Sequence, residues 1–203
     1  MTNSKLYTAQ PIITGFGPFA EHSYNPSWDA AQAMAEKMGL KAHRLPVTFD
    51  EAARFAHTHL RATAPSPVFF VHLGLAADRS SIAFEIRAKN ERSNASGASR
   101  VDPLIDGGPS SRSPQSELTS MVDGFNAAAP DDELQAQISR DCGRFVCNAL
   151  LYHSLGACEK ARQADRWADA VFIHIPKIKP RRARRLGAQL AGVFDSYRSE
   201  VGT

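Results

Sequence analysis

The chain of 203 residues lacks the features that mark several specialised classes of protein. Its three cysteines are odd in number and form no CxxC pair, which argues against a disulfide framework and a closed zinc site. Apolar runs such as PVFFVHLGLAA are far shorter than the roughly 20 residues of a membrane-spanning helix. The net charge of +3 is too small to indicate a polyanionic partner. We therefore expect free thiols, no membrane span and no nucleic acid partner.

The composition that is present is that of an ordinary globular protein. Hydrophobic residues make up 43% and charged residues 22% of the chain, and the length suits one well-buried core. We expect a single domain over residues 1–203. The first 16 residues show no charged leader followed by an apolar segment, so we expect no secretory signal and a cytoplasmic location.

Apolar periodicity predicts strands that alternate with helices. A helix start is clearest at Asn25, an N-cap residue followed by Pro26 at the first helical position, and Gly39 supplies the stop. Buried strands are expected at 11–16, 67–75 and 169–176, and helices at 26–38, from about 50, at 118–125, over the run 140–154, and at 186–197. This order predicts an α/β fold, a three-layer arrangement in which helices flank a twisted, mainly parallel sheet.

One long segment, at about 90–114, interrupts this pattern. It is rich in Ser, Asn, Gly, Pro and Asp and has no apolar periodicity. Loops of this length in compact domains are usually functional or mobile.

Ligands of open α/β sheets bind at the carboxyl ends of the strands. This rule selects the turns after Phe16, Leu75 and His174, together with the start of the helix that carries Cys147. The loop GFGPFA resembles a dinucleotide fingerprint only superficially, because its third glycine is replaced and the helix begins too late. Phe16 and Phe19 therefore either wall a small apolar site or fill the core.

Cys147 stands in RDCGRFVCNALLYHS, near the start of a predicted helix. The positive end of a helix dipole lowers a thiol pKa from about 8.5, which favours a nucleophile. Free cysteine is also among the most commonly buried residues, so a core role is the alternative.

Two further residues are polar but stand in segments that are expected to be buried. His174 in VFIHIP and Glu85 in IAFEIRA are polar groups within apolar runs, where each needs a partner. Both needs are met if the two side chains bind each other. With Cys147 they would then form a thiol, imidazole and carboxylate set of the triad kind.

The remaining histidines and the basic run at 177–185 carry weaker signals. The histidines show no metal-ligand spacing, so we expect no metal. The run KIKPRRARR contains no aromatic residues and is typical of a solvated loop and helix start, although an acidic partner is an alternative.

Four of these segments together resemble the pyroglutamyl peptidase I family of cysteine peptidases. TGFGPFAEHSYNPSW is similar to the family's N-terminal signature, and GLAADRSSIAFE to the segment that ends in its catalytic glutamate. SRDCGRFVCNALLYHSL resembles its nucleophile helix, and VFIHIP the strand that carries its histidine. The resemblance runs from about residue 11 to 195.

The resemblance implies a cysteine exopeptidase that removes N-terminal pyroglutamate from small peptides through an acyl-enzyme, without a cofactor. It assigns Cys147 as nucleophile, His174 as general base and acid, and Glu85 as the orienting carboxylate. It also implies a substrate pocket, and allows a homo-oligomer. The implied pocket residues are Phe16 and Phe19 around the ring, Phe145 and Val146 beside it, Asn25 at the ring carbonyl, and the backbone carbonyl of Leu75 at the lactam N–H.

The segment 90–114 departs from the family pattern. Either Arg92 or Arg100 could be the arginine that the family often places near the site, and Asp102 is an alternative to Glu85. Two other functions stay open: a catalytically weak relative that binds a peptide or acidic partner, and a cysteine hydrolase for another small amide.

Overall fold

A computed structural model describes residues 8–20, 22–93, 101–129 and 134–201. Its elements in chain order are β1 (Gln10–Phe16), α2 (Pro26–Lys37), β2 (His43–Leu45), α3 (Phe49–Ala62), β3 (Val68–Leu75), β4 (Ile82–Glu85), β5 (Ala88–Lys89), β6 (Ser111–Arg112), α4 (Leu118–Ala127), β7 (Ala136–Ser139), α5 (Val146–Gln163), β8 (Ala168–Ile175) and α6 (Pro180–Val201).

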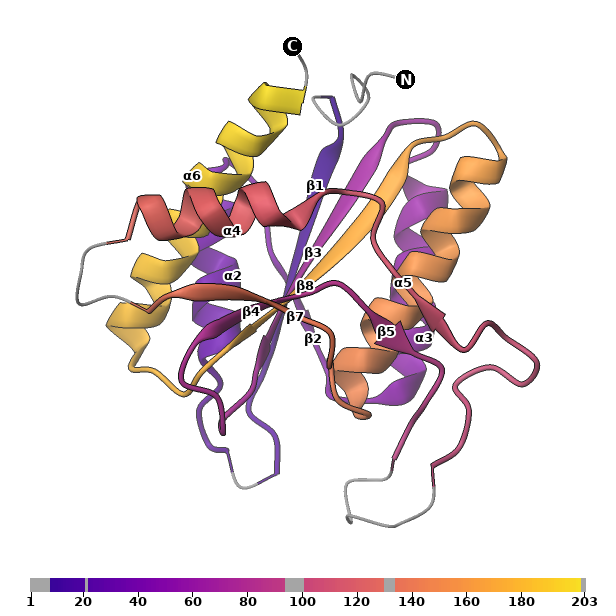
Figure 1. Ribbon diagram of the computed structural model, residues 1–203, viewed down its shortest axis with the longest axis horizontal. Coiled ribbons are helices and arrows are strands. Elements are labelled where there is room, and N and C mark those ends of the chain that lie inside the picture. The colour runs from indigo at the N-terminus through magenta and orange to yellow at the C-terminus, as the bar shows by residue number, and fades with distance from the viewer. Residues whose placement is uncertain (1–7, 21, 94–100, 130–133, 202–203) are drawn as a thin grey trace.

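Six of the strands form one sheet in the order β2-β1-β3-β8-β4-β7, and β5 pairs with β6. Every pairing in the large sheet is parallel except that of β4 with β8, which is antiparallel. Helices α2, α4 and α6 cover one face of the sheet, and α3 and α5 cover the other (Figure 1). The predicted α/β fold with a mainly parallel sheet is confirmed.

The two apolar runs form β3 and β8, the strands at the centre of the sheet, and every residue of both strands is buried. Strands buried on both faces read as continuous apolar segments, which is how they appear in the sequence. Helix α2 begins as predicted: the Asn25 side chain accepts hydrogen bonds from the backbone N–H and the hydroxyl of Ser27, and Pro26 opens the helix.

A polar ladder crosses the core between β1, β3 and α5. The fully buried ring of His72 bonds the Thr14 hydroxyl through Nδ1 at 2.8 Å and the Ser154 hydroxyl through Nε2 at 3.0 Å. Burial and the charge of His59 lower the pKa of His72 to about 3, so the ring is neutral at physiological pH. Both ring nitrogens are satisfied, which lets an imidazole occupy the interior.

The structure differs from the sequence prediction at the start of α5. The helix begins at Val146, so residues 140–145 form a turn and Cys147 is the second helical residue. Gly143 adopts φ +75°, a left-handed conformation that breaks helical continuity. Phe145 is extended and serves as N-cap without a side-chain hydrogen bond.

The described parts of the segment 90–114 are tied to the rest of the fold. Asn90 bonds the backbone of Ile105 through both ends of its amide. Arg112 forms an ion pair with Glu159 at 2.9 Å and lies over the ring of Tyr152. Both contacts fasten the segment to α5. Within the part of the chain that the structure describes, no helix is long and apolar enough to cross a membrane.

Candidate active site

The sheet places Glu85 and His174 side by side. Because β4 runs antiparallel to β8, Glu85 lies opposite Phe172 and therefore diagonal to His174 on the same face. His174 Nδ1 lies 2.9 Å from Glu85 Oε1, and Glu85 is fully buried. The contact inferred from the burial of these two residues is present.

Cys147 approaches the same place from α5. A Cβ built on Gly74 of β3 would lie 3.2 Å from the Cys147 sulfur, and Gly74 is the register partner of His174 in β8. Cys147 and His174 also line one cavity. The structure thus brings the thiol, the imidazole and the carboxylate together at the carboxyl ends of β3 and β8.

A glycine is required between the thiol and the sheet. A Cβ on Gly74 would lie only 2.5 Å from the ring of Phe172, closer than real side chains approach. The absence of a side chain at this position leaves the space in which Cys147 faces the strand.

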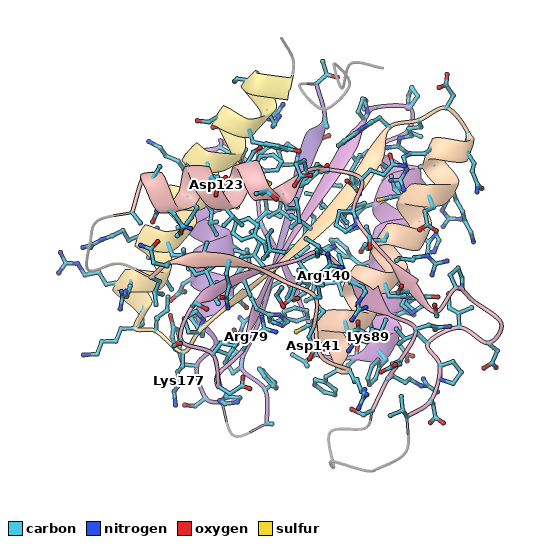
Figure 2. The ribbon with its side chains drawn as sticks, viewed as in Figure 1. Arg79, Lys89, Asp123, Arg140, Asp141 and Lys177 are labelled. Carbon is cyan, nitrogen blue, oxygen red and sulfur yellow. The ribbon has the colours of Figure 1, made fainter. Side chains whose placement is uncertain are left out.

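An arginine that the sequence did not single out completes the group. Arg79 Nη1 donates to Glu85 Oε1 at 2.7 Å, and Arg79 Nη2 donates to the backbone carbonyl of Asp141 at 2.6 Å. Figure 2 shows Arg79 beside Asp141 at the end of the sheet, with Lys89 on the far side of Asp141. Arg79 follows a central strand in the turn that its N–H closes on Ala76, a location that the strand-end rule does select.

Burial and charge act in opposite directions on Glu85. Burial is the largest single influence and raises the pKa of this carboxyl, but the hydrogen bonds with His174 and Ser139 and the charges of His174 and Arg79 together outweigh it. The pKa therefore lies below its usual value, and the group is ionised at neutral pH.

The Cys147 thiol is neutral at physiological pH. Burial, followed by the charge of Glu85, raises the pKa of Cys147 to about 12. The prediction that the helix terminus lowers this pKa is wrong, because removal of the sulfur from water outweighs the dipole effect at the first turn. Ionisation of this sulfur at neutral pH would therefore need a base beside it.

A cavity of about 510 Å³ opens beside the thiol. This volume lies within the range of about 300–1,000 Å³ that is common for small-molecule sites. Eight of the nine residues named from the sequence line the cavity: Phe16, Phe19, Asn25, Leu75, Phe145, Val146, Cys147 and His174. The ninth, Glu85, contacts His174 and does not line the cavity.

The aromatic walls are held from outside the cavity. Phe16 packs near Phe172 with ring centroids 6.5 Å apart, and Phe145 meets Phe49 edge to face at 5.5 Å. The ring of Phe19 lies tilted against that of His22, with centroids 5.1 Å apart, and the two residues pair through their backbones. These contacts fix rings of which Phe16 is buried and Phe19 and Phe145 are partly open to the cavity.

Asn25 connects the capped helix to the cavity. Its Oδ1 is used by Ser27, and its Nδ2 donates to the carbonyl of Gly17 at 3.0 Å. An amide nitrogen carries two N–H groups, so one remains beyond the bond to Gly17. The residue therefore both shapes the Phe16–Phe19 turn and faces the cavity.

Other candidates lie away from the site. Arg92 and Asp102 pair through their backbones, and neither lines the cavity. Glu85, and not Asp102, is the carboxylate that contacts His174. Arg100 lies outside the described residues.

Cys142 lines the cavity as a buried free thiol whose pKa is raised, first by burial. Among the described residues, no group of three or more His, Cys, Asp or Glu side chains could hold a metal ion.

Fold and site together define an α/β protein with a thiol and an imidazole in the wall of one cavity and a buried carboxylate in contact with the imidazole. The family profile described as "Pyroglutamyl peptidase" matches residues 10–190. The pyrrolidone-carboxylate peptidase of Yersinia pestis (strain Pestoides F) is 30% identical over 186 residues, which cover 87% of this chain and 82% of that protein. The chain belongs to the pyroglutamyl peptidase family.

Solved structures agree on the fold. The pyroglutamyl peptidase I of Bacillus amyloliquefaciens superposes with a TM-score of 0.74 at 21% identity, covering 92% of this chain and 96% of that one. A mutant pyrrolidone carboxyl peptidase of Pyrococcus furiosus gives a TM-score of 0.75 at 22% identity, with 94% and 98% covered. The family match makes the protein a pyroglutamyl peptidase of the cysteine-peptidase class, and the solved structures share its fold.

Proposed function

We propose that Cys147, His174 and Glu85 form the catalytic triad with which this pyroglutamyl peptidase removes an N-terminal pyroglutamate. The observation that carries the proposal is the 2.9 Å contact between His174 Nδ1 and the buried Glu85, with His174 and Cys147 in the wall of one cavity. A carboxylate that holds Nδ1–H leaves Nε2 free to act as the base.

The reaction would start from the neutral thiol. His174 takes the Cys147 proton as the sulfur attacks the carbonyl that follows the pyrrolidone ring. The resulting imidazolium protonates the departing amine, which leaves a thioester on Cys147. A water molecule, deprotonated by the same imidazole, then hydrolyses the thioester and releases pyroglutamate.

Backbone N–H groups would stabilise the oxyanion. Phe145 caps α5 without a side-chain hydrogen bond, so its side chain does not occupy the N–H groups of the first turn. Such groups at a helix start, beside the attacking sulfur, are suited to a developing negative charge.

The cavity explains the choice of substrate by exclusion. A pyrrolidone ring is flat, small and uncharged, so the faces of Phe16 and Phe19 and the remaining N–H of Asn25 suit it. An ordinary N-terminal residue would bring an ammonium ion into this apolar part of the cavity, where the loss of its hydration is costly.

Hydrolysis of a pyroglutamyl fluorogenic amide tests the triad. Cys147→Ala should abolish turnover, whereas Cys158→Ala should keep it, because Cys158 is a buried thiol in the same helix that does not line the cavity. Mass spectrometry of the rapidly quenched enzyme should find the pyroglutamyl group on Cys147. Turnover that survives Cys147→Ala would refute the assignment.

Two further expectations are proposals with tests of their own. Cell fractionation tests the cytoplasmic location, and sedimentation of the purified protein tests the homo-oligomer. The family's substrates are taken to be small peptides with N-terminal pyroglutamate, and a panel of pyroglutamyl dipeptides would define the residue preferred after the ring.

A further inference from the structure

Arg79 bonds two parts of the site with one guanidinium group. Its Nη1 lies 2.7 Å from Glu85 Oε1, the same oxygen that His174 Nδ1 approaches at 2.9 Å. Its Nη2 lies 2.6 Å from the carbonyl oxygen of Asp141, in the turn that leads into α5. The side chain therefore spans from the carboxylate to the segment that precedes the nucleophile.

Glu85 needs a partner whose charge does not change during turnover. Its side chain is fully buried, and an unpaired buried carboxylate is costly. In the proposed reaction His174 takes up the nucleophile's proton and gives it away again, so its charge changes during the cycle. Arg79 is always protonated and only 24% exposed, so its charge is present in every step.

We propose that Arg79 is a positioning residue of this enzyme, which keeps Glu85 ionised and fixes it relative to the turn before Cys147. This inference rests on the proposed triad, because its effect on catalysis passes through Glu85 and His174. With Glu85 ionised, His174 keeps its proton on Nδ1 and presents Nε2 as the base. Because Arg79 also binds the backbone carbonyl of Asp141, it fixes the distance between the Glu85 carboxylate and the turn that precedes α5.

The guanidinium suits this double role better than an ammonium would. Its donors lie in one plane at fixed angles, so two of them can bind separate acceptors at the same time. Arg79 Nη1 also lies 3.5 Å from the hydroxyl of Ser139, at the end of β7. Lysine at this position would keep the positive charge but offer a single nitrogen for these acceptors.

A matched control exists in the same region. Arg87 Nε donates to the carbonyl of Arg140 at 3.3 Å, one residue before Asp141. Arg87→Met therefore removes a positive charge and a bond to the same turn, while the contact with Glu85 stays. Arg79→Met removes both the charge and the contact.

The experiment measures kcat/KM against pH for wild type, R79M, R79K and R87M. In R79M the loss of the cation raises the pKa of Glu85, so the acid limb should move to higher pH. Activity at pH 7 should fall by about 10–100-fold, as for other residues that orient a reacting side chain through a second contact. R79K should keep the acid limb near that of wild type with a lowered kcat, and R87M should stay within about twofold throughout.

A second readout does not need substrate. The rate of Cys147 alkylation by iodoacetamide, located by peptide mass spectrometry, should fall off at a higher pH in R79M than in wild type, because the neutral thiol is alkylated readily only where the Glu85–His174 pair can take its proton. An acid limb and alkylation profile that are unchanged in R79M, or that shift equally in R87M, would overturn the inference. A wild-type enzyme without turnover would instead refute the triad, and the alkylation profiles would still decide the role of Arg79.

Discussion

The neutral core histidine makes acid stability a quantitative test of the structure. His72 has a pKa of about 3 when folded and about 6.5 when unfolded. Because the folded pKa is the lower one, the unfolded chain binds more protons between these values, and stability falls as pH drops through 6.5. At pH 5 the folded ring is still neutral, so proton binding to the unfolded chain lowers the free energy of unfolding by about 2 kcal/mol relative to high pH. About 0.2 kcal/mol of this loss is already present at pH 7, and the rest develops between pH 7 and pH 5.

Urea unfolding at pH 7 and pH 5 measures this term in a pair of variants. His72→Gln removes the titrating group but can still bond the hydroxyls of Thr14 and Ser154, so its loss of stability between the two pH values should be about 1.9 kcal/mol smaller than that of wild type. Thr14→Val is the control: it removes a partner of the ring and should lower stability at both pH values, while the ring still titrates. Equal pH dependence in wild type and His72→Gln would refute the reasoning.

Three shorter predictions concern the site and the surface. Gly74→Ala should abolish turnover and lower stability by about 1–3 kcal/mol in thermal melts, because the methyl group enters the space beside Cys147; a fully active variant would contradict the close approach. Glu85→Gln should reduce kcat by up to about 10⁴-fold with a fold unchanged by circular dichroism, since the amide does not hold the imidazole in the required tautomer; a reduction below tenfold would argue against an orienting role. Arg184→Met should change the free energy of unfolding by less than about 1 kcal/mol, although the residue pairs with Glu36 at 2.6 Å, because both side chains are about half exposed; a larger loss would show that this pair is coupled to the core.

Local rules predicted much of the fold because they act within a few residues. The cap at Asn25, the continuous apolar runs of β3 and β8 and the stop at Gly39 each follow from the chemistry of a short segment. The start of α5 was predicted less well, because the extended conformation of Phe145 depends on packing that no periodicity records. The reversed direction of β4 is also a property of the whole sheet and of no single segment.

Some features of the site could likewise be predicted from short segments of the sequence, and others could not. The pairing of Glu85 with His174 could be predicted because each was a buried polar group in need of a partner. Arg79 could not be singled out, since it stands in an irregular turn and its partners lie 6 and 62 residues away. The ionisation of Cys147 was predicted with the wrong sign, because the helix terminus is visible in the sequence and the depth of burial is not.

The protonated resting state of Cys147 has a consequence for the enzyme under oxidative stress. Peroxides react with thiolates, and the rate follows the thiolate fraction and the exposure of the sulfur. A thiol whose pKa is about 12 presents almost no thiolate at neutral pH. The empty enzyme should therefore resist peroxide better than peptidases whose cysteine rests as a thiolate, and covalent inhibitors should succeed when they carry a ring that fills the cavity.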